Sequence, residues 1–351
     1  MYSTCVLTKG KNRSALIDLE RQSIQLIPND LFEILINYNG FTLKEIKANF
    51  SPDNLGTIDE YYNFLFENDY VFCTNTPNLF PPISKDWDAP EIINNCIIDI
   101  GPDVKFDYAK IFKELDDLHC KFLEIRVYCV IEFHLIEEIL KHLNYSTIIY
   151  VNMLLPYSED ISLAMITELC DKNARLGGIT VYNSPYEKHE QSEDYAVPIN
   201  YIKQVIIDCK SCGNISSEYF AINIKDYTEF LNFNSCLNRK ISIDQNGNIK
   251  NCPSFRNAYG NISDTSLYEV AMNESFRHYW SITKEKIDKC KSCEFRHVCT
   301  DCRAYLEDPN DLFSAPLKCG YNPETLEWED WSKNPLKSNA IEYYSINRNE
   351  L

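Results

Sequence analysis

The sequence contains no long apolar run and has few basic residues for its size. Its 351 residues include 34 Lys and Arg against 52 Asp and Glu, which gives a net charge of −18. No apolar stretch approaches the roughly eighteen residues that a membrane-spanning helix needs. A surface this acidic repels nucleic-acid phosphates and anionic membranes, and it attracts cationic partners such as a Lys-rich peptide. We therefore expect neither nucleic acid nor a membrane among the partners of the chain.

Several common catalytic motifs are also absent. The sequence has no phosphate-binding loop of the Walker type, and its six histidines show no zinc-protease spacing. These absences argue against an ATP-using ligase and against a zinc protease. No secretory signal peptide opens the chain, so we expect a cytoplasmic protein whose cysteines stay reduced rather than forming disulfides.

Cysteine, by contrast, is abundant. Of the fifteen cysteines, seven gather towards the C-terminus. They are Cys236, Cys252, Cys290, Cys293, Cys299, Cys302 and Cys319. From Cys290 onward, successive cysteines are separated by two, five, two and sixteen residues. Thiolates gathered this densely need a soft metal to hold them, and iron–sulfur clusters and zinc are the two realistic choices.

A predicted hairpin links the first two of these cysteines. Apolar residues flank Asn246-Gly247, and Asn-Gly is the preferred two-residue hairpin turn because both positions tolerate positive φ. Ten residues lie between Cys236 and Gly247, and four more lie between Gly247 and Cys252. Folding the two strands together brings Cys252 towards Cys236.

This spacing resembles the SPASM domain, the C-terminal extension of many radical-SAM peptide maturases. The segments Tyr259–Ile262 and Cys290–Tyr305 also resemble that family, and the resemblance covers roughly residues 236–320. One departure is visible, since two residues separate Cys299 from Cys302 where three are usual.

The resemblance implies two [4Fe–4S] clusters, each held by cysteines. By analogy, one cluster is held by Cys236, Cys252 and Cys302, and the other by Cys290, Cys293, Cys299 and Cys319. The first cluster then lacks one protein ligand, which Cys209 or Cys212 could supply, and we prefer Cys212. Zinc remains the alternative, because Cys-x-x-Cys pairs also suit a tetrahedral zinc ion.

The chain lacks the three-cysteine loop with which radical-SAM enzymes bind S-adenosylmethionine. The strand predicted at Cys96–Ile100 runs instead into residues 101–106, which contain no cysteine. We therefore expect no S-adenosylmethionine cofactor, and the resemblance leaves open whether the chain is itself an enzyme.

The middle of the sequence nevertheless alternates strands and helices, which predicts an α/β fold with a parallel sheet or partial barrel. The predicted strands are Cys96–Ile100, Phe122–Val130, Thr147–Leu155, Ile179–Tyr182 and Tyr201–Ile207. The predicted helices are Asp107–His119, Glu132–Leu143 and Ser158–Ala174, the last ended by Gly177-Gly178. Tyr186–Asp194 reads as a surface loop, and the tail after Trp331 as poorly ordered.

The first 75 residues predict a separate module of three strands and three helices. The strands are Thr4–Thr8, Ser14–Asp18 and Ser23–Ile27, and the helices are Asn29–Asn37, Thr42–Asn49 and Thr57–Asn68, with a closing strand at Val71–Thr74. Thr42 and Thr57 each begin a capping box. Six Lys and Arg against ten Asp and Glu make DNA an unsuitable partner for this module.

The module resembles the winged-helix element that binds leader peptides in peptide-maturation enzymes, usually by adding a strand to a sheet edge. We expect Ser23–Ile27, or the helix start near Thr57–Tyr62, to border a groove for an extended leader peptide. A structural cap on the barrel is the alternative.

Together these features predict five segments. They are a leader-recognition module at 1–75, a Pro-rich linker at 76–90 that isolates it, a degenerate partial barrel at 91–230, a SPASM domain at 231–325 and a tail at 326–351. The whole resembles the SPASM-domain protein of grasp-with-SPASM systems, which implies an ATP-grasp ligase and a precursor peptide as partners. The alternative function is a zinc-stabilised adaptor without redox activity.

Overall fold

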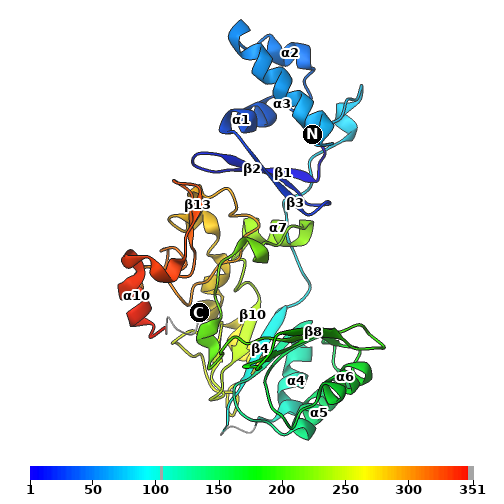
Figure 1. Cartoon of the computed structure of the whole chain (residues 1–351), viewed down its shortest axis with the longest axis vertical. Coiled ribbons are helices and arrows are strands. Elements are labelled where there is room, and N and C mark those ends of the chain that lie inside the picture. Colours follow the sequence, from blue (N-terminus) through cyan, green and yellow to red (C-terminus); the bar gives the residue numbers. More distant parts are fainter. Residues whose placement is uncertain (103–105, 347–351) are drawn as a thin grey trace.

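The computed structural model describes residues 1–102 and 106–346. At the N-terminus lies a small module, drawn in blue at the top of Figure 1. Its antiparallel sheet has the order β1-β2-β3, and three helices follow along the chain. The elements are β1 (Cys5–Lys9), β2 (Ser14–Asp18), β3 (Ser23–Ile27), α1 (Asn29–Asn37), α2 (Leu43–Lys47) and α3 (Leu55–Glu67). All three strands and all three helices lie where the sequence predicts them.

Of the two capping boxes predicted at helix starts in this module, one forms and the other does not. The capping box at Thr42 forms, because its hydroxyl accepts from Glu45 N at 3.3 Å and the Glu45 carboxylate accepts from Thr42 N at 2.8 Å. The box predicted at Thr57 does not form, since α3 already begins at Leu55. The closing strand predicted at Val71–Thr74 is also wrong: Tyr70 and Val71 pack into the core of the module without pairing to the sheet.

The centre of the molecule is an eight-stranded mixed sheet. Its order is β11-β10-β4-β5-β6-β7-β9-β8, with parallel pairing from β10 to β9 and an antiparallel strand at each edge. The strands are β4 (Asn95–Ile100), β5 (Phe122–Val127), β6 (Tyr150–Pro156), β7 (Leu176–Tyr182), β8 (Lys188–Gln191), β9 (Pro198–Tyr201), β10 (Lys240–Ile243) and β11 (Ile249–Lys250). The α/β fold is confirmed, and the sheet continues beyond residue 230 because β10 pairs in parallel with β4.

The two faces of this sheet have opposite character, because successive side chains of a strand point to opposite faces. One face is apolar and packs with helices α4 (Tyr108–Asp117), α5 (Phe133–Lys141) and α6 (Leu163–Lys172) into the largest core of the protein. The residues at alternate positions, such as Asn95, Glu124 and Asn152, are polar and belong to the other face. Parallel sheets are usually covered by apolar packing on both faces, so the polar face is unusual.

Several predicted boundaries in this region are wrong. Helix α6 begins at Leu163 with Ser162 as its cap, not at Ser158. Gly177 and Gly178 do not end that helix but lie inside β7. A Cβ at Gly177 would meet the ring of Tyr150 at 2.0 Å, so the glycine is needed for a close approach between strands rather than for a turn.

The end of the sheet also differs from the prediction. The predicted strand Tyr201–Ile207 is replaced by β9, which ends at Tyr201 and buries Ile199 and Tyr201. The predicted surface loop at Tyr186–Asp194 contains the polar edge strand β8. Short polar edge strands are a common protection against aggregation, and they carry little apolar signal in the sequence.

The C-terminal part consists mainly of short elements around the cysteines. It includes α7 (Ile224–Asn232), α8 (Leu267–Met272), α9 (Glu274–Arg277), β12 (Tyr321–Asn322), β13 (Glu327–Trp328) and α10 (Ser338–Tyr343). The predicted hairpin forms between β10 and β11, but its turn is not the predicted two-residue one: Gly247 N donates to Asp244 O at 2.8 Å, and Gly247, with a φ of 80°, is at positive φ whereas Asn246 is not. The tail is folded as far as residue 346, because Ala340 and Ile341 of α10 are buried beside Cys302 and Leu317. The cysteine-free loop predicted at 101–106 lies partly, at 103–105, outside the described residues, as do 347–351 at the end of the tail.

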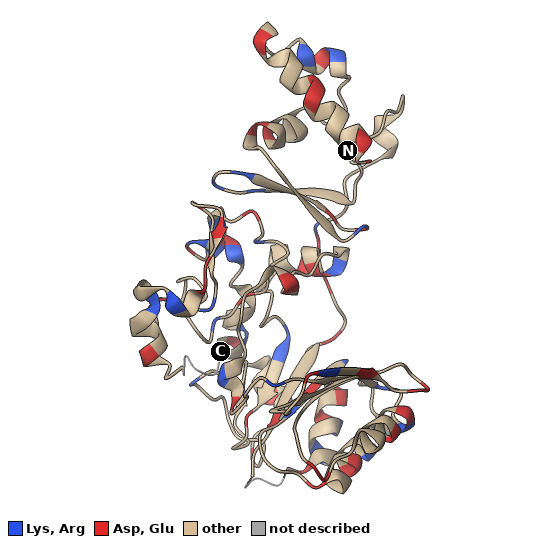
Figure 2. Ribbon diagram, in the orientation of Figure 1, with Lys and Arg blue, Asp and Glu red and all other residues tan. Residues whose placement is uncertain are grey.

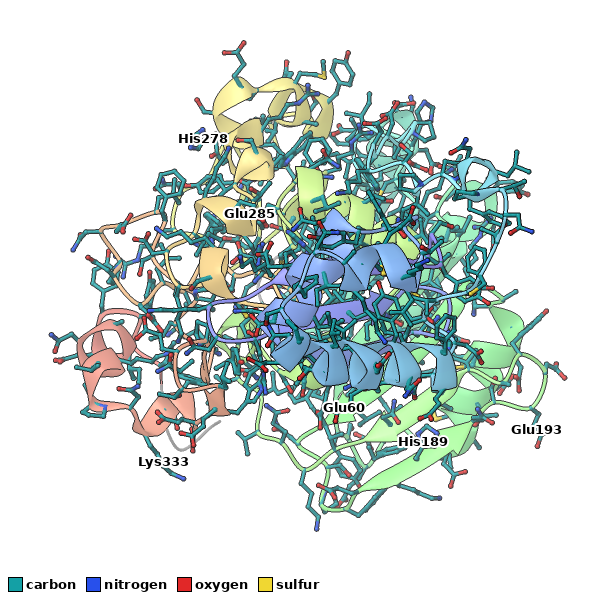
Figure 3. All side chains as sticks on the ribbon, turned by 90° about the horizontal axis from the view of Figure 1, so that it is seen from above. Glu60, His189, Glu193, His278, Glu285 and Lys333 are labelled. Atoms are coloured by element: carbon teal, nitrogen blue, oxygen red, sulfur yellow. The ribbon has the colours of Figure 1, made fainter. Side chains whose placement is uncertain are left out.

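The N-terminal module is not isolated from the rest of the chain, contrary to the prediction for the linker. Val6, Ala15 and Ile17 share one core with Phe295 and Val298 of the cysteine-rich part. Figure 2 shows basic residues at the β1–β2 turn, where the module faces the cysteine-rich part, and Lys11 pairs there with Glu324. Seen from above in Figure 3, the module covers the middle of the molecule.

The β1–β2 hairpin contacts one short loop closely. Lys11 N donates to Ser292 O at 2.9 Å, Thr8 Oγ1 is hydrogen-bonded to His297 Nδ1 at 3.0 Å, and Arg13 Nε donates to Glu294 at 2.7 Å. These contacts span the loop between Cys293 and Cys299, so the module fixes the position of that loop. Among the described residues, no helix is long and apolar enough to cross a membrane.

Adjacent residues of β2 allow this docking to be tested. Ile17 belongs to the core shared with the cysteine-rich part, whereas Leu16 belongs to the module's own core. Both side chains are fully buried, so replacement by Ala should cost about 2–5 kcal/mol in either case. We expect Ile17→Ala to make limited proteolysis cut between the module and the rest, whereas Leu16→Ala should expose sites inside the module. Identical cleavage patterns for the two variants would contradict the docking.

Candidate functional site

Four cysteines line a small cavity of about 20 Å³ in the C-terminal part. They are Cys290, Cys293, Cys299 and Cys319, named here the second cysteine set. The other walls include apolar residues such as Ile215, Phe220 and Trp328. Three cationic residues also line the cavity: Lys284, Lys289 and Arg296. The structure therefore gathers the four cysteines that the sequence assigned to one cluster.

Burial and neighbouring charge raise the pKa of three of these thiols, those of Cys290, Cys293 and Cys299. Burial raises the pKa of Cys290 to about 12, and the charges of Asp301, Cys319 and Cys299 add to the rise while Lys284 opposes it. Burial likewise raises the pKa of Cys299 to about 11, again against the pull of Lys284. Thiols in such surroundings lose their protons readily only when a positive charge lies beside them.

A second group of four cysteines surrounds Lys240. We name Cys212, Cys236, Cys252 and Cys302 the first cysteine set. Burial raises the pKa of Cys302 to about 12, and the charges of Cys236 and Cys212 raise it further. Burial also raises the pKa of Cys252, with added effect from Cys212 and Cys236. Lys240 Nζ lies 3.4 Å from Cys236 Sγ.

The structure distinguishes between the two candidates for the fourth member. Cys212 faces Cys236, Cys252 and Cys302, and its pKa is raised by burial and by the charge of Cys236. Cys209 lies in a 3₁₀ turn, and its charged neighbours are Asp99, Arg126 and Asp208 rather than the other cysteines. These surroundings favour Cys212 over Cys209 as the fourth member of the first set, which stays a prediction, and the strand predicted before the two cysteines is absent.

A glycine admits the sulfur of Cys302 to this set. Gly213, next to Cys212, has a φ of 89°, which side-chain-bearing residues rarely adopt. A Cβ at this position would lie 3.0 Å from Cys302 Sγ and 3.2 Å from the Tyr305 ring. No sequence pattern singled out Gly213, because its partner Cys302 is distant along the chain.

The remaining cysteines lie apart from these two sets. Cys96, Cys120 and Cys170 are buried in the core under the sheet, and Cys5 is buried in the N-terminal module. None of the fifteen cysteines forms a disulfide. Within residues 1–102 and 106–346, no three His, Cys, Asp or Glu side chains are arranged so that they could hold one metal ion. His297 is hydrogen-bonded to Thr8 on one ring nitrogen and to Glu285 at 2.9 Å on the other.

A cleft of about 1070 Å³ opens between the polar face of the sheet and α7. Its walls include Asn95, Glu124 and Asn152 from three adjacent strands, and Lys225 from α7. Lys240 also lines the cleft, so the cleft reaches the first cysteine set. The sequence carries a signal for this polar face, because Glu124 and Arg126 stand at alternate positions of the otherwise apolar strand β5.

A buried ion pair lies farther along the same face. Arg126 Nε and Nη2 donate to the Asp99 carboxylate at 2.7 and 3.0 Å, and both side chains are almost fully buried. Burial raises the pKa of Asp99 to about 6, although Arg126 counteracts the rise. Breaking such a pair would leave one charge buried without a partner, which is far more costly than losing an exposed pair.

Comparison with known proteins adds little to this description. No protein-family model matches the chain, and no curated protein matches it. Among solved structures, the chain is similar to Streptococcus suis SuiB, with 12% identity and a TM-score of 0.34, over 89% of this chain and 97% of that one. SuiB bound to S-adenosylmethionine matches over the same shares, with 11% identity and a TM-score of 0.33. A TM-score this low leaves the function to be inferred from the residues of this chain.

Gly213 offers a test of how the first set is assembled. Gly213→Ala adds backbone strain of about 1–3 kcal/mol and pushes against the Cys302 sulfur. Gly40→Ala is the matched control, because Gly40 has a φ of 90° but nothing within 4 Å of an added Cβ. We expect both variants to lose stability in urea, and only Gly213→Ala to change the number of cysteines that a thiol reagent modifies quickly. Equal thiol reactivity in both variants would contradict the close approach.

Proposed function

We propose that this chain is an iron–sulfur protein of a peptide-maturation system, which binds a precursor peptide and holds two clusters. The observation that carries the proposal is the gathering of eight cysteines into two sets of four, with no disulfide among them. Each set contains cysteines from distant parts of the sequence, so the fold maintains both arrangements.

The donor chemistry fits iron–sulfur clusters. A metal binds the thiolate, so it supplies the positive charge that these crowded thiols need to lose their protons. In a [4Fe–4S] cluster each cysteine bonds to a different iron, and the ligands therefore need not converge on one ion as they do around zinc. The cavity of the second set is also lined largely by apolar residues, which suits a cluster shielded from water.

The N-terminal module supports the peptide-binding half of the proposal. The outer edge of β3 has no paired strand among the described residues, and an exposed edge can take an added peptide strand. A groove of about 940 Å³ lies between α1 and α3, and its walls include Asp30, Glu33 and Tyr61. These acidic groups suit the Lys-rich leader peptide that the net charge favours.

No part of this proposal requires cleavage of S-adenosylmethionine by the chain itself. The sequence lacks the three-cysteine loop for that reaction and the phosphate loop of a Walker-type ligase. We therefore propose that an ATP-grasp ligase forms the covalent bonds in the peptide, and that this chain presents the peptide to it.

Two neighbouring cysteines test the cluster assignment. We expect wild-type protein purified without oxygen to be brown and to contain iron and inorganic sulfide. Cys212→Ala should lose the iron of one cluster, whereas Cys209→Ala, three residues away, should keep the wild-type content because Cys209 faces no other cysteine of the set. Cys293→Ala should lose the iron of the other cluster together with solubility.

Metal analysis and visible absorption of the four proteins decide the matter. Full iron content in both Cys212→Ala and Cys293→Ala would overturn the assignment. A colourless protein that contains zinc instead would overturn the iron–sulfur function and favour a zinc-stabilised adaptor.

The acidic groove is tested with a pair of charge reversals. Asp30 lines the groove, whereas Asp53 is exposed and does not line it. We expect Asp30→Lys to weaken binding of the cognate precursor peptide by about tenfold, which is about 1.4 kcal/mol, and Asp53→Lys to leave it unchanged. Fluorescence anisotropy of the labelled peptide at fixed ionic strength measures both. Equal effects of the two reversals would show that only the net charge matters.

A further inference from the structure

Two lysines of the cysteine-rich part have sulfur atoms as their closest charged partners. Lys284 is 5% exposed, and its Nζ lies 3.6 Å from Cys299 Sγ and 2.6 Å from Thr300 O. Lys240 is half-buried, and the thiol of Cys236 is the hydrogen-bonding partner of its Nζ at 3.4 Å. Among the described residues, neither lysine has a carboxylate within ion-pair distance.

The carboxylate whose charge acts on Lys284 is that of Asp301, and other residues already bind it. Asp301 is fully buried, pairs with Arg303 at 2.7 Å and accepts a hydrogen bond from Asn234 at 2.7 Å. The charge of Asp301 also acts on Lys284, but Arg303 already compensates it, and a buried ammonium group needs further negative charge beside it. The sulfur atoms of the second cysteine set are the groups in position to provide it.

Two other buried lysines in this part are bound differently. Lys318 donates to the carbonyl oxygens of Lys210 and Cys212, at 2.6 and 2.8 Å. Lys337 forms an ion pair with Glu307 at 2.8 Å and donates to two carbonyl oxygens. These lysines hold the backbone together, and neither has a cysteine sulfur as a hydrogen-bonding partner, which sets Lys240 and Lys284 apart.

Each of the two lysines serves one cysteine set. The sulfurs that act on Lys284 are those of Cys299, Cys290 and Cys319, all from the second set. Those that act on Lys240 are Cys236, Cys252 and Cys212, all from the first set. The two neighbourhoods share no cysteine, so a change at one lysine should leave the other set unaffected.

We propose that Lys240 and Lys284 are built-in counter-cations, one for each cysteine set, and that each raises the reduction potential of the cluster its own set binds. The inference rests on the proposed iron–sulfur function. A cluster with four thiolate ligands becomes more negative when it is reduced. A fixed ammonium group 3–4 Å from a ligand sulfur therefore stabilises the reduced form more than the oxidised form.

Four variants test this role in the full-length protein purified without oxygen. Lys284→Met and Lys240→Met keep a long side chain and remove the charge, whereas Lys284→Arg and Lys240→Arg keep the charge. The measurement is a redox titration of each protein followed by electron paramagnetic resonance, which gives one midpoint potential for each cluster. Iron and sulfide content is measured in the same samples.

We expect each Met variant to lower one midpoint potential and to leave the other unchanged. A tenfold change in the reduction equilibrium, which is about 59 mV for one electron, is the expected size. Lys284→Met and Lys240→Met should affect different clusters, and both Arg variants should lie close to wild type. A merely structural role would change cluster content without this crossed pattern of potentials.

Other results would overturn the inference. Unchanged potentials in both Met variants with full cluster content would do so, and so would equal shifts of both clusters in each variant. If a Met variant fails to fold, the Arg variant of the same lysine is the test. Loss of the cluster in that Arg variant would show that the shape of the side chain, rather than its charge, is needed, and would overturn the inference. If the wild-type protein contains zinc, the proposed function fails. The lysine role is then judged by zinc retention against a chelator, with loss in Met but not Arg variants supporting it and equal retention overturning it.

Discussion

The repulsion among crowded thiolates is the constraint on which the rest of this structure depends. Burial raises the pKa of members of both sets, such as Cys290 and Cys302, and the charges of neighbouring cysteines add to the effect. Such groups can lose their protons only beside positive charge, which in this chain comes from Lys284 and Lys240. The apolar core under the sheet could fold without that charge, whereas the apolar clusters of the cysteine-rich part are smaller and include the cysteines themselves. We infer that the stability of this part depends on what the cysteines bind.

The N-terminal module contacts a loop of the second cysteine set. Its β1–β2 hairpin contacts Ser292, Glu294 and His297, which lie on or next to the loop that joins Cys293 to Cys299. A peptide that adds to β3 would therefore bind to a sheet whose other strands already hold a cysteine loop. Peptide binding at β3, as proposed, would thereby be linked to the second cysteine set through β2, which has packed side chains on both of its faces.

Much of the secondary structure could be predicted from local patterns, because strands such as Ser14–Asp18 and helices such as Asn29–Asn37 carry clear apolar periodicity. The grouping of the cysteines followed the spacing of a known family, and the structure gathers the same residues. What the sequence could not reveal are contacts between distant segments: the docking of Ile17, the approach of Gly213 to Cys302, and the pairing of Lys284 with a sulfur. In each of these contacts the two residues are more than fourteen positions apart in the sequence. No local sequence pattern can therefore predict them.

The carboxyl end of β4 is closely packed. Gly101 directly follows β4, and a Cβ there would lie 2.8 Å from the side chain of Gln245, so the β10–β11 turn packs against the strand end. The Asp99–Arg126 pair fills the adjoining part of the polar face with two compensated charges. The open cleft lies instead at the amino ends of the strands, where Asn95, Phe122 and Lys240 begin β4, β5 and β10. A ligand in this cleft would meet Lys240, and through it the first cysteine set, so the accessible part of the polar face lies at the amino ends of its strands.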